Sequence, residues 1–285
     1  MARPSQRERA EEIQRLHARE ELLVVPNAWD GASARLYEAL GFEALSTTSS
    51  AMAWSYGDAD GQNMAFEDVL AVVTRIAEAV DVPVGVDYEG GYLDEAGDIE
   101  RSVEALLHTG AVGFGLEDTD FKAATGVRPA GEHAELIARA REVCDRRGVP
   151  ALIVGRTELF LRTDATAETG ADEVARRLKL YAEAGADVVF APGSEDPALL
   201  ARLVAEVGKP VNVLRLRRST SLASLAELGV RRVTIGGAGY ATALAALEGA
   251  MAGIRKGSFD AWDAIGRPSP EVFGRIAAPR RGAAR

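Results

Sequence analysis

Residues 83–92 read PVGVDYEGGY, an apolar run that ends in two carboxylates and a pair of glycines. Residues 84–87 have the length and composition of a short buried strand. Successive strand residues point to opposite faces of a sheet, so Asp87 and Glu89 are predicted to share one face. Carboxylate oxygens at a strand end suit Mg²⁺ or Mn²⁺. The stretch therefore predicts a metal site, with a solvated acidic turn as the alternative.

Short apolar runs of this kind alternate with helix-like segments along most of the chain, which is the pattern of repeated strand–helix units. Glycines such as Gly110 and Gly148 precede several strands, where they can end the preceding helix. The predicted strands are 22–26, 44–47, 84–87, 112–117, 151–156, 188–191, 211–214 and 232–235. The predicted helices lie near 31–40, 66–80, 97–109, 131–146, 169–184, 196–207, 221–228 and 239–253. Eight such units favour an α/β fold of the (β/α)₈ TIM-type barrel class.

A chain of 285 residues could hold two average domains, but an α/β barrel also reaches this length as one domain. Because no linker interrupts the alternation, we predict a single domain over 1–285, with the barrel core at about 5–260. Residues 258–276 form a C-terminal extension with apolar residues around a Gly-Arg-Pro break. They predict two helical pieces that dock either on their own barrel or, swapped, on a neighbouring subunit.

Composition favours small-molecule chemistry in the cytoplasm. A net charge of -10 argues against a nucleic-acid or anionic-membrane surface. No apolar run approaches the roughly 20 residues of a membrane span, and the charged N-terminal segment predicts no secretion. The single cysteine, Cys144, excludes an intrachain disulfide and a cysteine-based zinc cluster, and three histidines argue against a histidine-rich metal site. We therefore expect no nucleic-acid partner, no membrane and a small-molecule substrate.

Polar residues lie where the predicted strands end, and barrels of this type build their active sites at the carboxyl ends of the strands. Besides Asp87 and Glu89, the candidates are Thr48, Ser49 and Ser50 after the second strand, Glu117 in the fourth, Arg156 in the fifth and Asn212 in the seventh. Carboxylates can hold a cation, and a guanidinium can bind a substrate carboxylate through two points. Alternatively, Arg156 pairs with Glu117 or Glu89 only to neutralise buried charge.

The glycine-rich turn 236–239 precedes the last predicted helix of the barrel. Such a turn can hold a phosphate at a helix N-terminus. Glycine also permits close packing of helix and strand, and packing is the favoured interpretation.

Seven motifs, in order over roughly residues 20–250, resemble the isocitrate lyase and phosphoenolpyruvate mutase superfamily. They are PNAWDGASA, STTSSAMAWSYGDADG, VGVDYEGGY, GLEDT, GRTELF, YAEAGADVVFAPG and PVNVL. The resemblance implies a (β/α)₈ barrel, dependence on Mg²⁺, 2-oxo or 2-hydroxy carboxylate substrates, and chemistry through an enolate-like intermediate. It also implies a homo-oligomer, a dimer or more often a homotetramer, that swaps a C-terminal helix.

The resemblance further implies roles for individual residues. These are Asp87 as the direct metal ligand, Glu89 and Glu117 as ligands mainly through metal-bound water, Arg156 as the partner of the substrate carboxylate, Ser49 and Ser50 as further carboxylate donors, and Asp60 as the acid that closes over the site. Thr48 and Asn212 are added as substrate-binding candidates at the strand ends. Lys122 is a catalytic candidate in the loop after the fourth strand, which is expected to help close the site.

That loop departs from the family pattern. Relatives that cleave isocitrate-type substrates carry a lysine-cysteine-glycine-histidine stretch there, whereas residues 118–129 read DTDFKAATGVRP, without cysteine or histidine. The asparagine associated with phosphonate chemistry is not evident, and Thr125 stands near its place. Cys144 falls within a predicted helix and is interpreted as a packed residue. The metal site is therefore better supported than any single reaction.

The sequence leaves three functional hypotheses. The leading one is an Mg²⁺-dependent enzyme that cleaves a C–C bond of a small oxaloacetate-like or malate-like acid by lysis, decarboxylation or hydrolysis. The second is P–C bond chemistry on phosphonopyruvate or phosphoenolpyruvate, for which Lys122 and Arg128 are the nearby cations. The third is a non-catalytic barrel that binds a ligand. Buried carboxylates without a metal cost several kcal/mol each, which argues against the third.

Overall fold

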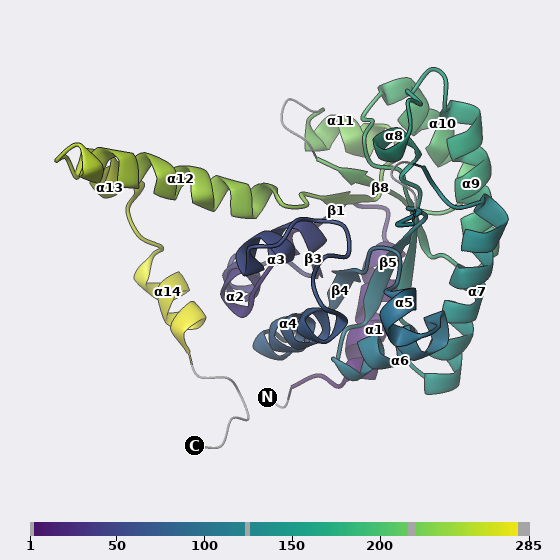
Figure 1. Cartoon of the computed structure of the whole chain (residues 1–285), viewed down its shortest axis with the longest axis horizontal. Coiled ribbons are helices and arrows are strands. Elements are labelled where there is room, and N and C mark those ends of the chain that lie inside the picture. The colour runs from purple at the N-terminus through teal and green to yellow at the C-terminus, as the bar shows by residue number, and fades with distance from the viewer. Residues whose placement is uncertain (1–2, 123–125, 216–219, 279–285) are drawn as a thin grey trace.

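The strands of the chain form one parallel sheet that curls into a barrel (Figure 1). The structure is a computed structural model that describes residues 3–122, 126–215 and 220–278. Within these ranges the strands are β1 (Leu23–Val25), β2 (Asn27–Ala28), β3 (Leu45–Thr47), β4 (Val84–Asp87), β5 (Gly113–Glu117), β6 (Leu152–Arg156), β7 (Val188–Phe190), β8 (Val211–Leu214) and β9 (Arg232–Thr234). Their order is β1-β9-β8-β7-β6-β5-β4-β3-β2, with every neighbouring pair parallel.

One strand more than the eight predicted is present because a short strand, β2, follows the first predicted strand directly after Pro26. Proline has no backbone N–H to donate to a ladder. The residues before it, β1, pair with β9, and the residues after it, β2, pair with β3. β1 and β2, on either side of Pro26, thus lie at the two ends of the sheet, and the predicted (β/α)₈ barrel is confirmed.

Helices cover the outside of the barrel and run close to their predicted bounds. They are α2 (Gly31–Ala39), α4 (Phe66–Ala79), α6 (Ile99–His108), α7 (Ala130–Arg147), α9 (Ala171–Glu183), α10 (Pro197–Val207), α11 (Leu222–Glu227) and α12 (Ala238–Arg255). Gly148 ends α7 in the left-handed conformation at φ 64°, as predicted for this glycine. Short helices α3 (Ser49–Tyr56), α5 (Leu93–Ala96) and α8 (Leu159–Arg162) follow strand ends and were not predicted. In the described parts of the chain, no helix has both the length and the apolar character of a membrane span.

Helix α1 (Gln6–His17) closes the amino-terminal end of the barrel. It starts at a capping box between Ser5 and Glu8. The Gln6 side chain donates a hydrogen bond of 2.9 Å to the carbonyl of Ala111, just before β5, and Ile13 is buried at the barrel floor. A site in the barrel is therefore open only toward the carboxyl ends of the strands.

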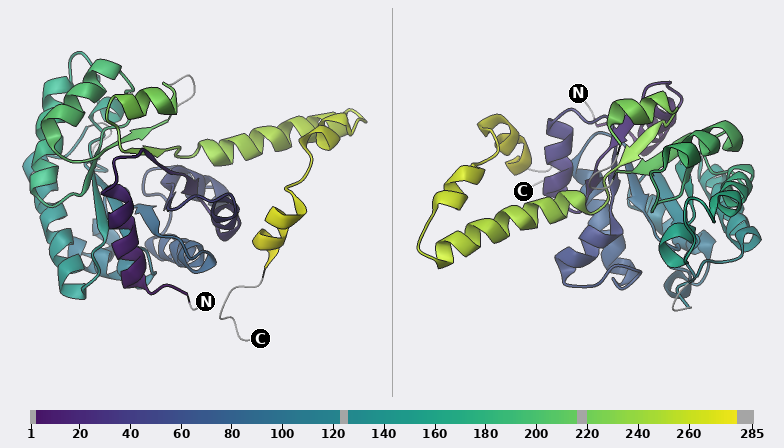
Figure 2. Two further views of the ribbon diagram at one scale, coloured as in Figure 1. Left: turned by 180° about the vertical axis from the view of Figure 1, so that it is seen from behind. Right: turned by 90° about the horizontal axis from the view of Figure 1, so that it is seen from above.

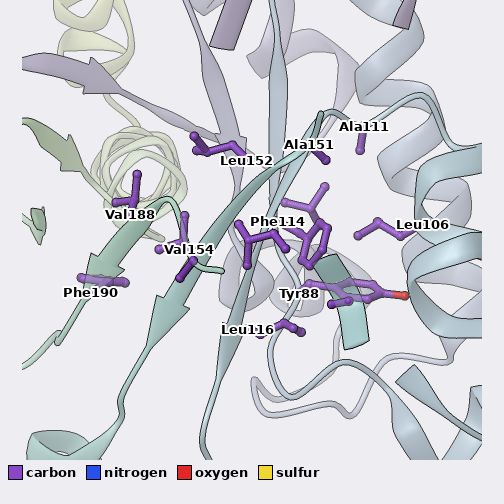
Figure 3. Packing of buried hydrophobic residues seen from close by; sticks show 14 of the residues in the cluster. Tyr88, Leu106, Ala111, Phe114, Leu116, Ala151, Leu152, Val154, Val188 and Phe190 are labelled. Carbon is purple, nitrogen blue, oxygen red and sulfur yellow. The ribbon is translucent and has the colours of Figure 1, made fainter. Parts of the chain in front are cut away.

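The main core lies between the sheet and its helices (Figure 3). Tyr88 is fully buried there, and its hydroxyl donates a hydrogen bond of 3.0 Å to the carbonyl of Ser102 on α6. Phe114 on β5 packs beside it, with ring centroids 6.4 Å apart. Because these residues face outward to the helices, their strand neighbours Asp87 and Gly115 face the barrel interior.

The C-terminal extension forms the two predicted helical pieces, α13 (Asp260–Ile265) and α14 (Pro270–Ala277). Figures 1 and 2 show α12 and α13 reaching away from the barrel, while α14 turns back toward α2. Arg35 on α2 donates a hydrogen bond of 3.0 Å to the carbonyl of Ile276. The extension therefore docks in part on its own barrel and leaves large apolar side chains exposed on the rest: Leu244, Leu247, Met251, Phe259, Trp262 and Ile265.

His133 on α7 leads to a prediction about acid stability. Its ring packs edge-on against Tyr181 with centroids 4.8 Å apart, and burial lowers its pKa from 6.5 to about 4. Between these two pKa values His133 is protonated in the unfolded chain and neutral in the folded chain. Its contribution to the free energy of unfolding is therefore complete above pH 6.5 and is lost as the pH falls toward 4. We expect His133→Gln to reduce this acid-induced loss of unfolding free energy by up to about 3 kcal/mol.

Urea denaturation at pH 7.0 and pH 4.5 measures the effect. The exposed His108→Gln is the matched control and should behave as the wild type. An equal loss of stability in wild type and His133→Gln would contradict the prediction.

Candidate active site

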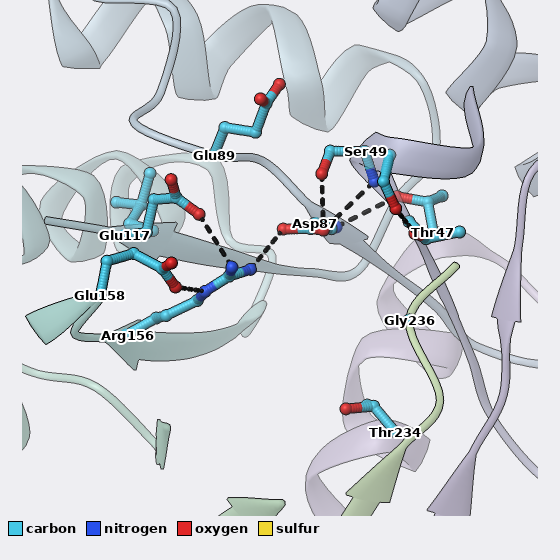
Figure 4. Close-up of polar contacts among 12 residues, drawn as sticks. Thr47, Ser49, Asp87, Glu89, Glu117, Arg156, Glu158, Thr234 and Gly236 are labelled. Atoms are coloured by element: carbon cyan, nitrogen blue, oxygen red, sulfur yellow. Dashed lines mark hydrogen bonds and ion pairs between the residues drawn. The ribbon is translucent and has the colours of Figure 1, made fainter. Parts of the chain in front are cut away.

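Asp87 stands at the carboxyl end of β4 and is held from two sides (Figure 4). Its Oδ2 accepts hydrogen bonds from the backbone N–H of Ser49 at 3.2 Å and from the Ser49 hydroxyl at 3.0 Å. Its Oδ1 accepts one from Arg156 Nη1 at 3.1 Å. The Asp87 backbone N–H donates to the hydroxyl of Thr47 at 3.0 Å. These contacts fix the orientation of the carboxylate at the mouth of the barrel.

Arg156, at the end of β6, pairs with three carboxylates. Nη1 contacts Asp87, Nη2 lies 3.2 Å from Glu117, and Nε contacts Glu158. The guanidinium carbon lies 5.3 Å from the ring centroid of Phe190. The charge-neutralising pair with Glu117 is thus present and a pair with Glu89 is not. Arg156 also lines the cavity described in the next paragraph. Its position therefore fits both roles considered from the sequence, neutralisation of buried charge and binding of a substrate carboxylate.

A cavity of about 210 Å³ opens beside Asp87 and runs down into the barrel. It brings together these predicted site residues: Thr48, Ser49, Ser50, Asp60, Asp87, Arg156 and Asn212. Thr48 and Ser50 exchange a hydrogen bond of 3.0 Å between their hydroxyls at the start of α3. Four segments far apart in the sequence therefore converge on one polar pocket.

Glu89 lies beside this cavity and not on its wall. The strand ends at Asp87, and Glu89 adopts a left-handed backbone with φ 49°, so the simple alternation that put both carboxylates on one face does not hold here. The Glu89 side chain accepts hydrogen bonds from the hydroxyl of Tyr92 and the backbone N–H of Gln62. It lines a small adjoining pocket together with Asp60 and Asp87.

Around Arg156 the site gathers more carboxylates than this guanidinium can balance. Burial, together with the charges of Glu158 and Asp87, raises the pKa of Glu117 to about 8 despite Arg156. Burial also raises the pKa of Glu89 to about 7. At the rim, desolvation and the charge of Asp87 raise the pKa of Asp60. A divalent cation bound among these carboxylates would stabilise their charged forms and lower their pKa values.

The donor set fits a cation held directly by Asp87 and otherwise through water. In the part of the chain that the structure describes, no three His, Cys, Asp or Glu side chains are grouped closely enough to bind one ion together. Mg²⁺ commonly uses one or two carboxylates and keeps several waters. Glu89 and Glu117 therefore fit as outer acceptors around a single direct ligand.

The structure does not bring Lys122 to the cavity. Its Nζ forms an ion pair of 3.1 Å with Asp94, and both side chains are largely exposed. Arg128 donates to the carbonyl of Gly90 at 3.5 Å. Thr125 lies outside the described residues. The contacts of the described loop residues thus give no support for Lys122 as a catalytic group in this conformation.

The sequence analysis missed the supports of Arg156. The Glu158 backbone N–H donates to Asp118 Oδ1 at 2.8 Å, and Asp118 Oδ2 accepts from the hydroxyl of Tyr181 at 2.6 Å and from Arg177 at 3.0 Å. This buried network holds Glu158 against Arg156. The acid two residues after Arg156 in GRTELF was the available signal, because a buried arginine at a strand end needs a nearby anion.

Two other interpretations from the sequence concern packing. A Cβ on Gly237 would lie 2.8 Å from the Ser50 hydroxyl and from Trp54, and one on Gly239 would lie 2.6 Å from the Tyr37 hydroxyl. Close approach therefore accounts for these glycines, in support of the packing interpretation. Cys144 is fully buried on α7, where burial raises its pKa to about 11, as expected for a packed and unreactive thiol.

Residues 13–255 match the family model described as phosphoenolpyruvate phosphomutase. The chain belongs to this family. It is 30% identical over 249 residues to the oxaloacetate decarboxylase of Paraburkholderia xenovorans, covering 84% of this chain and 80% of that one. Oxaloacetate acetylhydrolase in complex with the product oxalate is a similar solved structure, with a TM-score of 0.82, 25% identity, and 96% and 95% of the two chains covered. Phosphonopyruvate hydrolase in complex with oxalate and Mg²⁺ shares the fold, at a TM-score of 0.81 and 22% identity over 94% of each chain.

Membership in the phosphoenolpyruvate phosphomutase family confirms the superfamily resemblance drawn from the seven motifs. The superfamily contains lyases, decarboxylases and hydrolases. Membership therefore supports an enzyme of the carbon–carbon lyase type over a barrel that only binds a ligand.

Proposed function

We propose that this protein is an Mg²⁺-dependent enzyme that cleaves a C–C bond of a small 2-oxo or 2-hydroxy carboxylic acid of the oxaloacetate or malate kind. The observation that carries the proposal is the meeting of Asp87 and Arg156, 3.1 Å apart, on one cavity with the hydroxyls of Ser49 and Ser50. The carboxylate can bind a cation, and the neighbouring guanidinium can bind an anion. Together they form a site for an anionic substrate that chelates a metal.

Asp87 would hold the cation directly, and Glu89 and Glu117 through water, with Mn²⁺ as an alternative to Mg²⁺. When bound, such a cation withdraws electrons from a 2-oxo acid and stabilises the negative charge left by cleavage. Binding of a cation would explain why several carboxylates lie together in a partly buried position, where their negative charges repel one another.

The residues of the chain supply binding, orientation and exclusion of water. Arg156 offers N–H groups in a planar fork that suits a substrate carboxylate, and its contact with Phe190 and its carboxylates fixes that plane. Thr48, Ser49 and Ser50 add donors at the start of α3. Asp60 at the rim would close over bound substrate. Since the cavity lies inside the barrel, these donors act in a medium of low polarity where they stabilise negative charge more strongly than in water.

The rival P–C chemistry requires additional cations for a phosphonate group. The two loop cations named for that purpose are engaged elsewhere: Lys122 pairs with Asp94, and Arg128 donates to Gly90. The loop also lacks the cysteine of isocitrate-cleaving relatives. Without a placed acid, an oxaloacetate-like acid is the better substrate, because its enolate product can take a proton from water after release.

Incubation with oxaloacetate, phosphonopyruvate and 2-methylisocitrate, each with Mg²⁺ and with excess chelator, tests the proposal. We expect Mg²⁺-dependent turnover of oxaloacetate-like acids and poor turnover of 2-methylisocitrate. Turnover of phosphonopyruvate alone would move the assignment to P–C chemistry. Undiminished turnover in chelator would remove the metal from the proposal.

We also propose that the protein is a cytoplasmic homo-oligomer, a dimer or tetramer, in which the exposed apolar face of α12 and α13 contacts another subunit. Isolated exposed apolar residues are common, but a row of them on a projecting arm marks an interaction surface. Light scattering should therefore give a mass of at least two chains. Leu247→Glu together with Trp262→Glu should shift it toward the monomer, and a monomeric wild type would contradict the proposal.

A further inference from the structure

A second guanidinium, that of Arg232, lines the same cavity deeper in the barrel. Arg232 starts β9 and is only 5% exposed. Across residues 3–122, 126–215 and 220–278, no carboxylate lies within 4.0 Å of it, and its Nε has no hydrogen-bond partner. Burial lowers its pKa to about 10, and only the more distant Asp87 opposes that shift. Arg232 thus differs from Arg156, which has three carboxylate partners.

Neutral polar groups accompany Arg232 on this wall. Asn212 on β8 lies opposite it in the strand register and is 2% exposed. Its Nδ2 donates to the Thr234 hydroxyl at 3.1 Å, while its Oδ1 has no partner in the described structure. Figure 4 shows Thr234 across the cavity from Arg156. Neutral polar groups and one positive charge therefore gather at the floor of the cavity, below the mouth where Asp87 lies.

The opposite wall leaves room in front of them. β9 and β5 are four places apart in the sheet order, as are β8 and β4, so these strands face each other across the barrel. The inward positions there include Gly85 and Gly115. A Cβ on either would meet no atom closer than 3.8 Å, and neither has a positive φ. Neither packing nor backbone conformation requires glycine, whereas barrels of this kind usually fill such positions with bulky side chains.

A buried guanidinium facing open space is costly unless an anion compensates it, and its planar fork matches a carboxylate. We propose that Arg232, with Asn212 and Thr234, forms a second anion-binding subsite that holds the distal carboxylate of the substrate. This inference rests on the proposed function and assigns the two ends of its dicarboxylic substrates, with the 2-oxo acid end at Asp87 and Arg156 and the other carboxylate at Arg232. Monocarboxylates such as pyruvate would fill only the upper part.

The first test needs no metal. Thermal unfolding of the full chain in chelator is followed with rising succinate, against sodium chloride of equal ionic strength. Saturating succinate should raise the wild-type midpoint by roughly 5 °C. Arg232→Met should abolish the rise, and Arg232→Gln serves if the Met variant fails to fold. Arg202→Met, on helix α10 outside the barrel, is the matched control and should respond as the wild type. An equal response in wild type and Arg232→Met, including no response in either, would overturn the subsite.

The second test assigns the anion. Calorimetry in the presence of Mg²⁺ compares the binding of two acids. Oxalate is expected to reach only Asp87 and Arg156, whereas 3,3-difluorooxaloacetate also carries the distal carboxylate. Arg232→Met should weaken binding of the longer acid by about 10- to 100-fold while oxalate changes by less than about two-fold. An equal effect on both acids, or none, would overturn the assignment to the distal carboxylate. If the wild type binds neither acid with Mg²⁺, the proposed function fails, and the succinate response still decides whether Arg232 binds an anion.

Discussion

Asp87→Asn should lower kcat/KM for an oxaloacetate-like substrate by about 10³-fold, equivalent to about 4 kcal/mol of transition-state stabilisation. The amide keeps the volume of the carboxylate but removes the charge and the anionic oxygen through which we expect the cation to bind directly. Neither Glu89 nor Glu117 can substitute without rearrangement, because Glu89 contacts Tyr92 and Gln62, and Glu117 contacts Arg156. Mg²⁺ affinity, measured by calorimetry, should fall in parallel.

The fold should survive this change, because Arg156 retains Glu117 and Glu158. Asp172→Asn is a suitable control, since the Asp172 side chain is 93% exposed on α9 and forms an ion pair with Arg202 at the surface. We expect the control to match the wild type in kcat/KM and in Mg²⁺ affinity. A folded Asp87→Asn protein with wild-type activity would exclude Asp87 as the metal ligand.

The barrel could be predicted from the sequence because each strand–helix unit carries its own local signal. An apolar run, a helix-ending glycine and an amphipathic segment repeat through the chain, and their periodicity does not depend on distant contacts. The split at Pro26 is likewise a local effect. The short helix α3 was missed because Ser49 and Ser50 read as a polar strand end, although Thr48 can precede a helix.

The sequence predicted many of the residues that form the site, but it did not predict how their side chains are oriented. Parallel strands bring their carboxyl ends together, so Ser49, Asp87 and Arg156 were expected to meet, and they do. The position of Glu89 depends on a left-handed residue after the strand, which no periodicity reveals. Lys122 lies in a loop, and the orientation of its side chain follows from its ion pair with the exposed Asp94, which the sequence pattern does not reveal.

Arg232 was passed over for a related reason. It stands at the start of a strand, in GVRRVTIGG, and charged residues at strand starts are usually exposed. Its direction follows only from the register that places Arg232 beside the inward-facing Asn212. The signal in the sequence was a charged residue at a position that strand alternation places on the inner face of the barrel.

Arg156→Lys should lower kcat/KM by about 10²-fold or more and should not be rescued by its retained charge. A lysine ammonium cannot reproduce the planar fork that contacts Asp87, Glu117 and Glu158 and still present N–H groups to a substrate carboxylate. Removing a positioned donor from a catalytic site costs about this much. Steady-state kinetics should show the loss in KM and kcat together, because both binding and alignment depend on the guanidinium.

A purely structural Arg156 would make a different prediction, and chemical rescue separates the two. Arg156→Ala leaves Glu117 buried beside Asp87 and Glu158, so its melting temperature should fall whichever role holds. If Arg156 binds substrate, added methylguanidinium should restore part of the activity of Arg156→Ala in a saturable way, since it can refill the space between the carboxylates and contact the substrate. If methylguanidinium restored only the melting temperature, or if Arg156→Lys kept wild-type kcat and KM, Arg156 would be a partner of buried charge alone.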